Sequence, residues 1–263
     1  MDSSLSTMVV VLIESDRLQV LREEMIMTKQ HHQPSPIIVA FDCADMASAT
    51  LLAEQLSPAL CRAKVGKELF TACGMAVIDM LHDKGYEVFL DLKFHDIPTT
   101  VAKAIAVIAA KGIWMTNVHA VGGQRMMMAA KAAINELNAS TQLIAVTVLT
   151  SMTEQDLAAT GVVQPLTEQV TTLALAAKES GLDGVVCSAQ EAKQLRRDCG
   201  ESFTLVTPGI RPVSAVGDDQ RRTLTASQAF DQGSHYLVIG RPITQSNTPL
   251  AALESLIEEL DIL

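Results

Sequence analysis

A chain of 263 residues is long enough to bury a large core, and it fits either one α/β barrel or two smaller domains. Its 20 basic and 30 acidic residues give a formal net charge of −10, which argues against nucleic acid and anionic membranes as partners. The five cysteines are odd in number and lack metal-ligand spacing, which is typical of reduced thiols in a cytoplasmic protein.

Residues 1–33 differ in pattern from the rest of the chain. The apolar run 8–13 is far too short to span a bilayer, and no Lys or Arg precedes it, so it makes a poor signal peptide. Residues 15–27 have the spacing of a short amphipathic helix, and the Pro-containing segment 31–36 is typical of a linker. We expect a dispensable leader, with Met27 as an alternative start. The alternative is a helix that packs on a partner subunit.

From residue 36 onward, short apolar runs alternate with longer segments of helical spacing. Apolar runs bounded by Gly and polar residues are typical of strands buried in a parallel sheet. The predicted strands are 37–41, 62–65, 86–92, 114–119, 143–149, 184–187, 203–207 and 236–239. The predicted helices are 46–56, 68–84, 99–111, a Met- and Ala-rich stretch ending at 137, 166–180, 189–199, 225–232 and 249–260.

Eight strand–helix units in about 225 residues predict a single-domain α/β fold, a (β/α)8 TIM barrel over residues 34–263. The structural alternative is an open, doubly wound parallel sheet. Against that alternative, no GxGxxG follows the first predicted strand, which ends at Asp42 instead.

The stretch 91–98 reads Asp-Leu-Lys-Phe-His-Asp-Ile-Pro and follows a predicted buried strand. Because side chains alternate along a strand, Asp91 and Lys93 are expected to project from the same side at its end. Ile-Pro at 97–98 suits the first turn of the next helix and leaves Asp96 in the intervening turn. Barrels and open α/β sheets bind ligands at this end of their strands. The structural alternative is a simple ion pair, with Asp96 as a helix N-cap.

Charged and polar residues also follow most of the other predicted strands, at the face where barrels carry their active sites. With Asp91, Lys93 and Asp96 from the stretch above, the residues at these strand ends are Asp42, Lys64, Thr150, Ser151, Arg211, Gly240 and Arg241. An alternating array of Lys64, Asp91, Lys93 and Asp96 would keep each lysine charged beside a carboxylate. Its donors would already point to the place where substrate charge develops.

The loops after the last two predicted strands have the residues of a phosphate site. Backbone NH groups near Gly209 and Gly240 are suited to hold an anion, and the guanidinium of Arg241 can bind it with two hydrogen bonds. In barrels these two loops often bind phosphate. The structural alternative for Gly240 and Arg241 is a turn with an exposed arginine. No HxH, HExxH or acidic ligand cluster predicts a metal site.

Several motifs, in order along the chain, resemble the orotidine 5′-phosphate decarboxylase family, and the bacterial branch in particular. They are KVGKELF (64–70), DLKFHDIP (91–98), AVTVLTSM (145–152), GVVCSAQE (184–191), TPGIRP (207–212), GDDQRR (217–222) and VIGRPIT (238–244). The resemblance runs from about residue 36 to the C-terminus and does not include the leader. It implies a homodimeric (β/α)8 barrel that decarboxylates orotidine 5′-phosphate to UMP, the last step of de novo pyrimidine synthesis, without a cofactor or metal.

The resemblance also implies roles for individual residues. Lys93 would be the proton donor, and Asp91 would face the substrate carboxylate. Asp42 and Lys64 would bind the ribose, with Lys64 also part of the charge network. Asp96 would enter the neighbouring subunit's site, with Ile97 and Thr100 beside it. The remaining substrate-binding residues would be Thr150 and Ser151 at the pyrimidine edge, Gln220 between base and phosphate, and Arg211, Gly240 and Arg241 at the phosphate.

Two other functions stay open from the sequence. One is the related sugar-phosphate branch of this barrel group, which shares a DxKxxD strand and uses Mg²⁺. That branch has an acidic metal ligand where this chain has Lys64, and it lacks the combination of TPGIRP and GDDQRR. The other is a non-catalytic barrel that binds a phosphometabolite. Such a binder has no need for Asp91 beside a substrate carboxylate.

Overall fold

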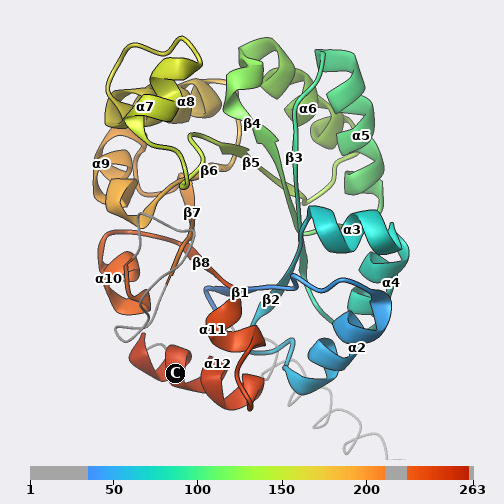
Figure 1. Ribbon diagram of the computed structural model, residues 1–263. Helices are drawn as coiled ribbons and strands as arrows, with labels where there is room; N and C mark the ends of the chain where they lie inside the picture. Colours follow the sequence, from blue (N-terminus) through green and yellow to red (C-terminus); the bar gives the residue numbers. More distant parts are fainter. Residues whose placement is uncertain (1–34, 211–223, 261–263) are drawn as a thin grey trace, which may run out of the picture. The chain divides into compact units, whose positions relative to one another are not determined.

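The computed structural model describes residues 35–210 and 224–260, and all of these belong to one compact unit. Eight parallel strands pair in sequence order, and β1 pairs with β8 to close the barrel (Figure 1). The predicted (β/α)8 fold is therefore confirmed. The strands are β1 (Ile37–Ala40), β2 (Arg62–Val65), β3 (Val88–Phe94), β4 (Met115–His119), β5 (Gln142–Val146), β6 (Gly184–Val186), β7 (Thr204–Pro208) and β8 (Tyr236–Ile239).

Helices surround the strands on the outside of the barrel (Figure 1). Their apolar faces pack against the outward side chains of the strands in one large buried cluster. The helices are α2 (Met46–Gln55), α3 (Lys67–Cys73), α4 (Ala76–Asp83), α5 (Pro98–Ala110), the 3-10 turn η1 (Ala120–Gly122), α6 (Gln124–Glu136), α7 (Glu154–Ala159), α8 (Leu166–Glu179), α9 (Ala189–Cys199), α10 (Ala226–Asp231), α11 (Arg241–Thr244) and α12 (Pro249–Glu259).

The helix prediction was wrong in two respects. The predicted helix 68–84 is two helices, because α3 ends at Gly74, whose φ of 59° is a left-handed conformation that glycine adopts without a Cβ clash. Helices α7 and α11 were not predicted. The sequence does carry a signal for α7, since Thr153 and Asp156 form a capping box at its start.

Alternation along the strands builds a second, smaller apolar cluster. It consists of Ile38, Ala40, Phe89, Met115, Ile144, Val206 and Val238. Two residues further along their strands, on the same face as members of this layer, lie Asp42, Asp91 and Asn117. Because every second side chain of a strand lies on the same face, these polar groups lie directly above the apolar layer, at the carboxyl ends of the strands.

Arg62 lies on the opposite side of this apolar layer, two residues before Lys64 on β2, and is only 5% exposed. Its guanidinium carbon is 4.3 Å from the ring centroid of Trp114 and 5.0 Å from that of Tyr236, and both rings pack against the apolar layer. Arg62 Nε donates to Glu87 Oε2 at 2.7 Å, and Nη1 donates to the Ser35 carbonyl at 2.8 Å. A buried cation is thus satisfied by aromatic faces and oxygen acceptors at the amino ends of the strands.

Replacing Arg62 with Met keeps much of the side-chain volume and removes the guanidinium from both rings and from Glu87. We expect the free energy of unfolding, measured with urea, to fall by about 2 kcal/mol through loss of cation–π contacts and charged hydrogen bonds. The control is Lys84→Met, which breaks the exposed Lys84–Glu54 pair and should cost about 0.5 kcal/mol or less. Equal losses in the two variants would contradict this role for Arg62.

Candidate active site

A cavity of about 350 Å³ opens at the carboxyl ends of the strands. Ala40, Phe89 and Val238 of the inner apolar layer form part of its lining. The charged groups that line it are Asp42, Lys64, Asp91, Lys93 and Arg241. Ligand sites in this fold occur at this end of the barrel, so the cavity lies where chemistry is expected.

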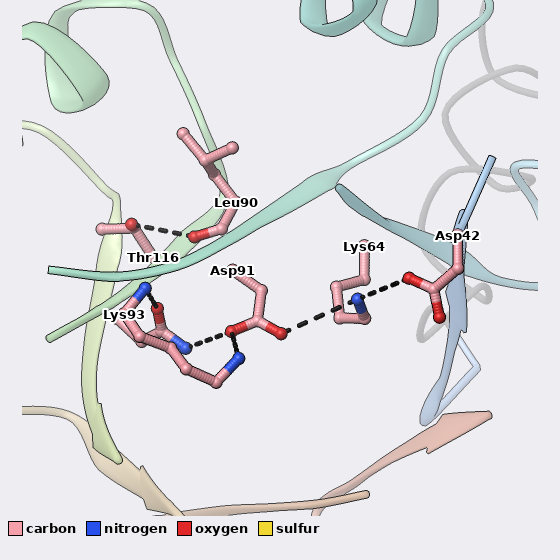
Figure 2. A network of polar contacts seen from close by, with 7 residues as sticks. Asp42, Lys64, Leu90, Asp91, Lys93 and Thr116 are labelled. Carbon is pink, nitrogen blue, oxygen red and sulfur yellow. Dashed lines mark hydrogen bonds and ion pairs between the residues drawn. The ribbon is translucent and has the colours of Figure 1, made fainter. Parts of the chain in front are cut away.

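Four of these side chains form a row of alternating charge across the cavity (Figure 2). Lys64 Nζ lies 3.2 Å from Asp42 Oδ1 and 3.7 Å from Asp91 Oδ2. Lys93 Nζ donates to Asp91 Oδ1 at 2.6 Å. Each ammonium therefore has a carboxylate beside it, and the two lysines face each other across Asp91.

The Asp91 carboxyl is the more enclosed of the two carboxylates in the row, with a side chain 13% exposed against 62% for Asp42. Burial by itself raises the pKa of this carboxyl. The charges of Lys64 and Lys93, with hydrogen bonds from Lys93 and Asn117, outweigh burial and hold the pKa of Asp91 below its ordinary value. Asp91 is therefore a carboxylate at neutral pH, although it is surrounded by protein.

The end of β3 departs from a regular strand in a way that simple alternation did not predict. Its register against β4 pairs Leu90 with Thr116 and then Phe94 with Val118, so three residues of β3 lie opposite Asn117 alone. Lys93 has a φ of 56°, in the left-handed region. Asp91 and Lys93 do converge, as predicted, but a bulge brings them together.

The sequence reasoning missed Asn117, which is fully buried in β4. Its side chain accepts a hydrogen bond from Lys93 N at 2.8 Å and donates to Asp91 Oδ1 at 2.7 Å. A polar amide inside the apolar run 114–119 was the available signal, because a buried amide must find hydrogen-bond partners.

A model of the orotidine 5′-phosphate decarboxylase / HUMPS family matches residues 35–256. The chain belongs to this family. A protein of Alcanivorax borkumensis named orotidine 5′-phosphate decarboxylase is 58% identical over 226 residues, covering 86% of this chain and 98% of that relative. A protein of Chromohalobacter salexigens with the same name is 54% identical over 226 residues, covering 86% of this chain and 96% of the relative.

Solved structures of the orotidine 5′-phosphate decarboxylase family agree with the barrel. The crystal structure of orotidine 5′-phosphate decarboxylase from Lactobacillus acidophilus matches with a TM-score of 0.76 at 40% identity, covering 86% of this chain and 99% of that one. The corresponding enzyme from Pyrococcus horikoshii OT3 matches with a TM-score of 0.68 at 22% identity, a likeness that shows the fold alone.

Most of the site residues that the family resemblance implies lie together. Those that line the cavity are Asp42, Lys64, Asp91, Lys93, Thr150, Ser151, Gly240 and Arg241. Pro208 and Gly209, at the end of β7, line it as well. The implied substrate-binding residues Arg211 and Gln220 lie outside the described residues.

Asp96, Ile97 and Thr100 do not line the cavity of their own chain, and all three are exposed. In a single chain the carboxylates beside Lys64 are those of Asp42 and Asp91, and Asp96 is not among them. The N-cap alternative for Asp96 was wrong. Ile97 is the N-cap of α5 and gives no side-chain cap, while Asp96 Oδ1 accepts a hydrogen bond from the adjacent Ile97 N at 2.6 Å.

Within residues 35–210 and 224–260, no three His, Cys, Asp or Glu side chains are grouped as a metal site. No helix in that part of the chain is long and apolar enough to cross a membrane. All five cysteines are free thiols, and burial raises the pKa of the Cys61 thiol to about 12. Cys61 is therefore a neutral core residue.

Proposed function

We propose that this chain decarboxylates orotidine 5′-phosphate to UMP and CO2 without a cofactor or metal, in the last step of de novo UMP synthesis. The observation that carries the proposal is the row Asp42–Lys64–Asp91–Lys93 in the barrel cavity. The reaction comes from the relatives, since the chain is 58% identical to a protein named orotidine 5′-phosphate decarboxylase over 86% of its length.

The proposed chemistry needs a fixed cation. When the bond from C6 of orotate to the carboxylate breaks, its electron pair stays on C6, where the ring delocalises it poorly. The Lys93 ammonium stabilises this pair electrostatically and then donates a proton to C6, so CO2 leaves and a C–H bond replaces the C–C bond. Lys93 lies against Asp91, so its charge is in place before the reaction begins.

Asp91 has a second effect in this proposal. It faces the carboxylate that departs as CO2, and its lowered pKa keeps it charged. Repulsion between the two carboxylates raises the energy of the bound substrate and is relieved as CO2 leaves. Lys64 holds Asp91 in place from the opposite side.

The remaining polar residues of the cavity are proposed to bind the rest of the nucleotide. Thr150 and Ser151 read the pyrimidine edge, and Asp42 and Lys64 bind the ribose hydroxyls. Gly240, Arg241 and Arg211 hold the phosphate, and Gln220 bridges the base and the phosphate. Binding energy from a phosphate remote from C6 can be used to lower the reaction barrier.

Lys93→Ala removes both the cation and the proton donor from the proposed reaction centre. We expect kcat, followed as the loss of orotate absorbance, to fall at least about 10³-fold while the barrel stays folded by circular dichroism. Arg241→Ala is the contrasting variant and should mainly raise KM, by about 10- to 100-fold, because it removes a charged phosphate partner. Substantial turnover by Lys93→Ala would show that the mechanism is wrong.

Metal independence separates this function from that of the sugar-phosphate branch, which needs Mg²⁺. Lys64 occupies the place of that branch's acidic metal ligand, and a lysine ammonium has no lone pair for a cation. We expect orotidine 5′-phosphate turnover to be unchanged after dialysis against EDTA. Loss of turnover on chelation and its recovery with Mg²⁺ would move the assignment to the sugar-phosphate branch.

The proposal also includes a homodimer in which Asp96 acts in the partner's site. Asp96 is exposed and lies outside the cavity of its own chain, and the adjacent Ile97 is 67% exposed. An exposed aliphatic side chain beside a carboxylate, at the turn after Lys93, suits a subunit contact near the site. A two-fold axis would then give two identical composite sites.

Subunit mixing tests this arrangement with Lys93→Ala and Asp96→Ala, each expected to be nearly inactive alone. After dissociation and random reassociation, about half of the dimers are mixed, and by symmetry one site in each mixed dimer has neither substitution. The mixture should recover about a quarter of wild-type turnover. If Asp96 serves its own chain, every site keeps a defect and nothing is recovered. Mass spectrometry of the mixture checks that subunits have exchanged.

A cytoplasmic location is part of the proposal, because free thiols at all five cysteines are typical of a reducing compartment. We also propose that the leader, residues 1–33, is dispensable for the reaction. The match to the family model begins at residue 35, after the leader.

A further inference from the structure

Asn117 is a fully buried polar residue in β4 that does not line the cavity. It lies opposite the bulge of β3, where Asp91, Leu92 and Lys93 together face this one residue. Its side chain reaches the bulge from the neighbouring strand, two residues beyond Met115 of the inner apolar layer. A substrate in the cavity would therefore meet Asp91 and Lys93 and not Asn117.

The carboxamide of Asn117 bonds to both of these residues. Its Oδ1 accepts from the backbone N–H of Lys93 at 2.8 Å, and its Nδ2 donates to Asp91 Oδ1 at 2.7 Å. The two ends of the amide cannot be exchanged, because a backbone N–H only donates and a carboxylate only accepts. The same Asp91 oxygen accepts from Lys93 Nζ at 2.6 Å. The Asn117 side chain therefore links the backbone of Lys93 to the carboxylate of Asp91, which also accepts a hydrogen bond from the Lys93 ammonium.

The backbone conformation of Lys93 is one that needs a stabilising hydrogen bond such as that from Lys93 N to Asn117 Oδ1. Its φ of 56° places a residue with a Cβ in the left-handed region, which non-glycine residues adopt only where the surroundings hold them. Asn117 Oδ1 supplies an acceptor for Lys93 N where the bulge interrupts the β3–β4 register. This conformation turns the side chain of Lys93 back onto Asp91 (Figure 2).

We propose that Asn117 is a positioning residue for the reaction: it locks the left-handed backbone of Lys93 and the carboxylate of Asp91 into one arrangement, so that the ammonium stands at the reacting carbon. The inference rests on the proposed decarboxylation and adds a residue to it that does not touch substrate. It requires that loss of the amide lowers turnover of bound substrate and leaves binding intact.

Thr116 offers a matched control from the same strand. It is also fully buried, and its Oγ1 donates to the Leu90 carbonyl at 3.0 Å, so it too links β4 to β3 by a side chain (Figure 2). Alternation turns it to the opposite face of β4 from Asn117. Thr116→Val therefore removes one buried bond between these strands without touching Asp91 or Lys93.

Asn117→Leu keeps the size of the side chain and loses both hydrogen bonds. We expect its kcat to fall about 100-fold, the cost of a catalytic group displaced by about an ångström. The KM for orotidine 5′-phosphate and the Kd for UMP should stay near wild type, because the phosphate and ribose contacts are unchanged. Thr116→Val should keep the kcat of the wild type.

Asn117→Asp adds a second test, the pH dependence of kcat, which a purely structural role of Asn117 would not change. A charged aspartate at this position keeps an acceptor for Lys93 N but turns an oxygen toward the Asp91 carboxylate, whereas a protonated one regains a donor. The ratio of its kcat to that of wild type should therefore rise as pH falls. The ratio for Asn117→Leu should not rise, because this variant regains no donor and only loses a hydrogen bond that lowers the pKa of Asp91. The other titratable groups around Asp91, which are Asp42, Lys64, Lys93 and His119, are present in every variant. A pH dependence found in Asn117→Asp and not in Asn117→Leu therefore comes from the introduced carboxyl and its coupling to these groups.

Four results in solution would overturn the inference. They are a kcat of Asn117→Leu equal to that of Thr116→Val, a loss of UMP binding as large as the loss of kcat, a flat pH ratio for Asn117→Asp, and failure of both Asn117 variants to fold while Thr116→Val folds. A crystal structure of Asn117→Leu tests it without turnover, since Lys93 unchanged at its present φ and still on Asp91 would also overturn it. Absence of turnover in the wild type would instead refute the proposed decarboxylation and leave the crystallographic test in force.

Discussion

The Asp91 carboxylate lies mostly buried between two ammonium groups, and the arrangement of the site depends on these contacts. A buried charge is tolerated only when opposite charges and hydrogen bonds replace the water that it has lost. Lys64 comes from β2, Lys93 from the bulge of β3 and the Asn117 amide from β4, so three consecutive strands satisfy one carboxylate. The same contacts that make its burial tolerable also hold two cations at the cavity.

The barrel separates this polar site from a second buried cation by an apolar layer. Arg62 and Lys64 are two residues apart on β2 and face the same way, yet Arg62 stacks on Trp114 and Tyr236, and Lys64 lines the cavity. The layer that includes Phe89 and Met115 lies between them. Because side chains repeat every two residues along a strand, a single strand supplies one cation to the aromatic rings below the layer and another to the cavity above it.

Fold and function rest on different observations in this protein. The likeness to the Pyrococcus horikoshii enzyme at 22% identity supports the barrel alone, and barrels of this kind carry many chemistries. The row of charges is the observation on which the proposed stabilisation of developing negative charge rests. The relatives at 50% identity and above indicate the molecule on which the enzyme acts. Backbone strain occurs at the same site, since Lys93, where the proposed reaction occurs, has a left-handed φ instead of ordinary strand geometry.

The amino-acid sequence by itself determined the eight strands, their order and the polar residues at their ends, because apolar runs and the period of two are local patterns. Only the tertiary structure decided which side chains at those strand ends contact one another. Asn117 contacts Lys93 and Asp91 across separations of 24 and 26 residues, and no local pattern encodes such a pair. The left-handed φ of Lys93 likewise occurs where the register between β3 and β4 shifts. That Asp96 lies outside the cavity of its own chain also became clear only from the folded barrel. Strand spacing predicted where the charges gather, but only the closed barrel decided which of them touch.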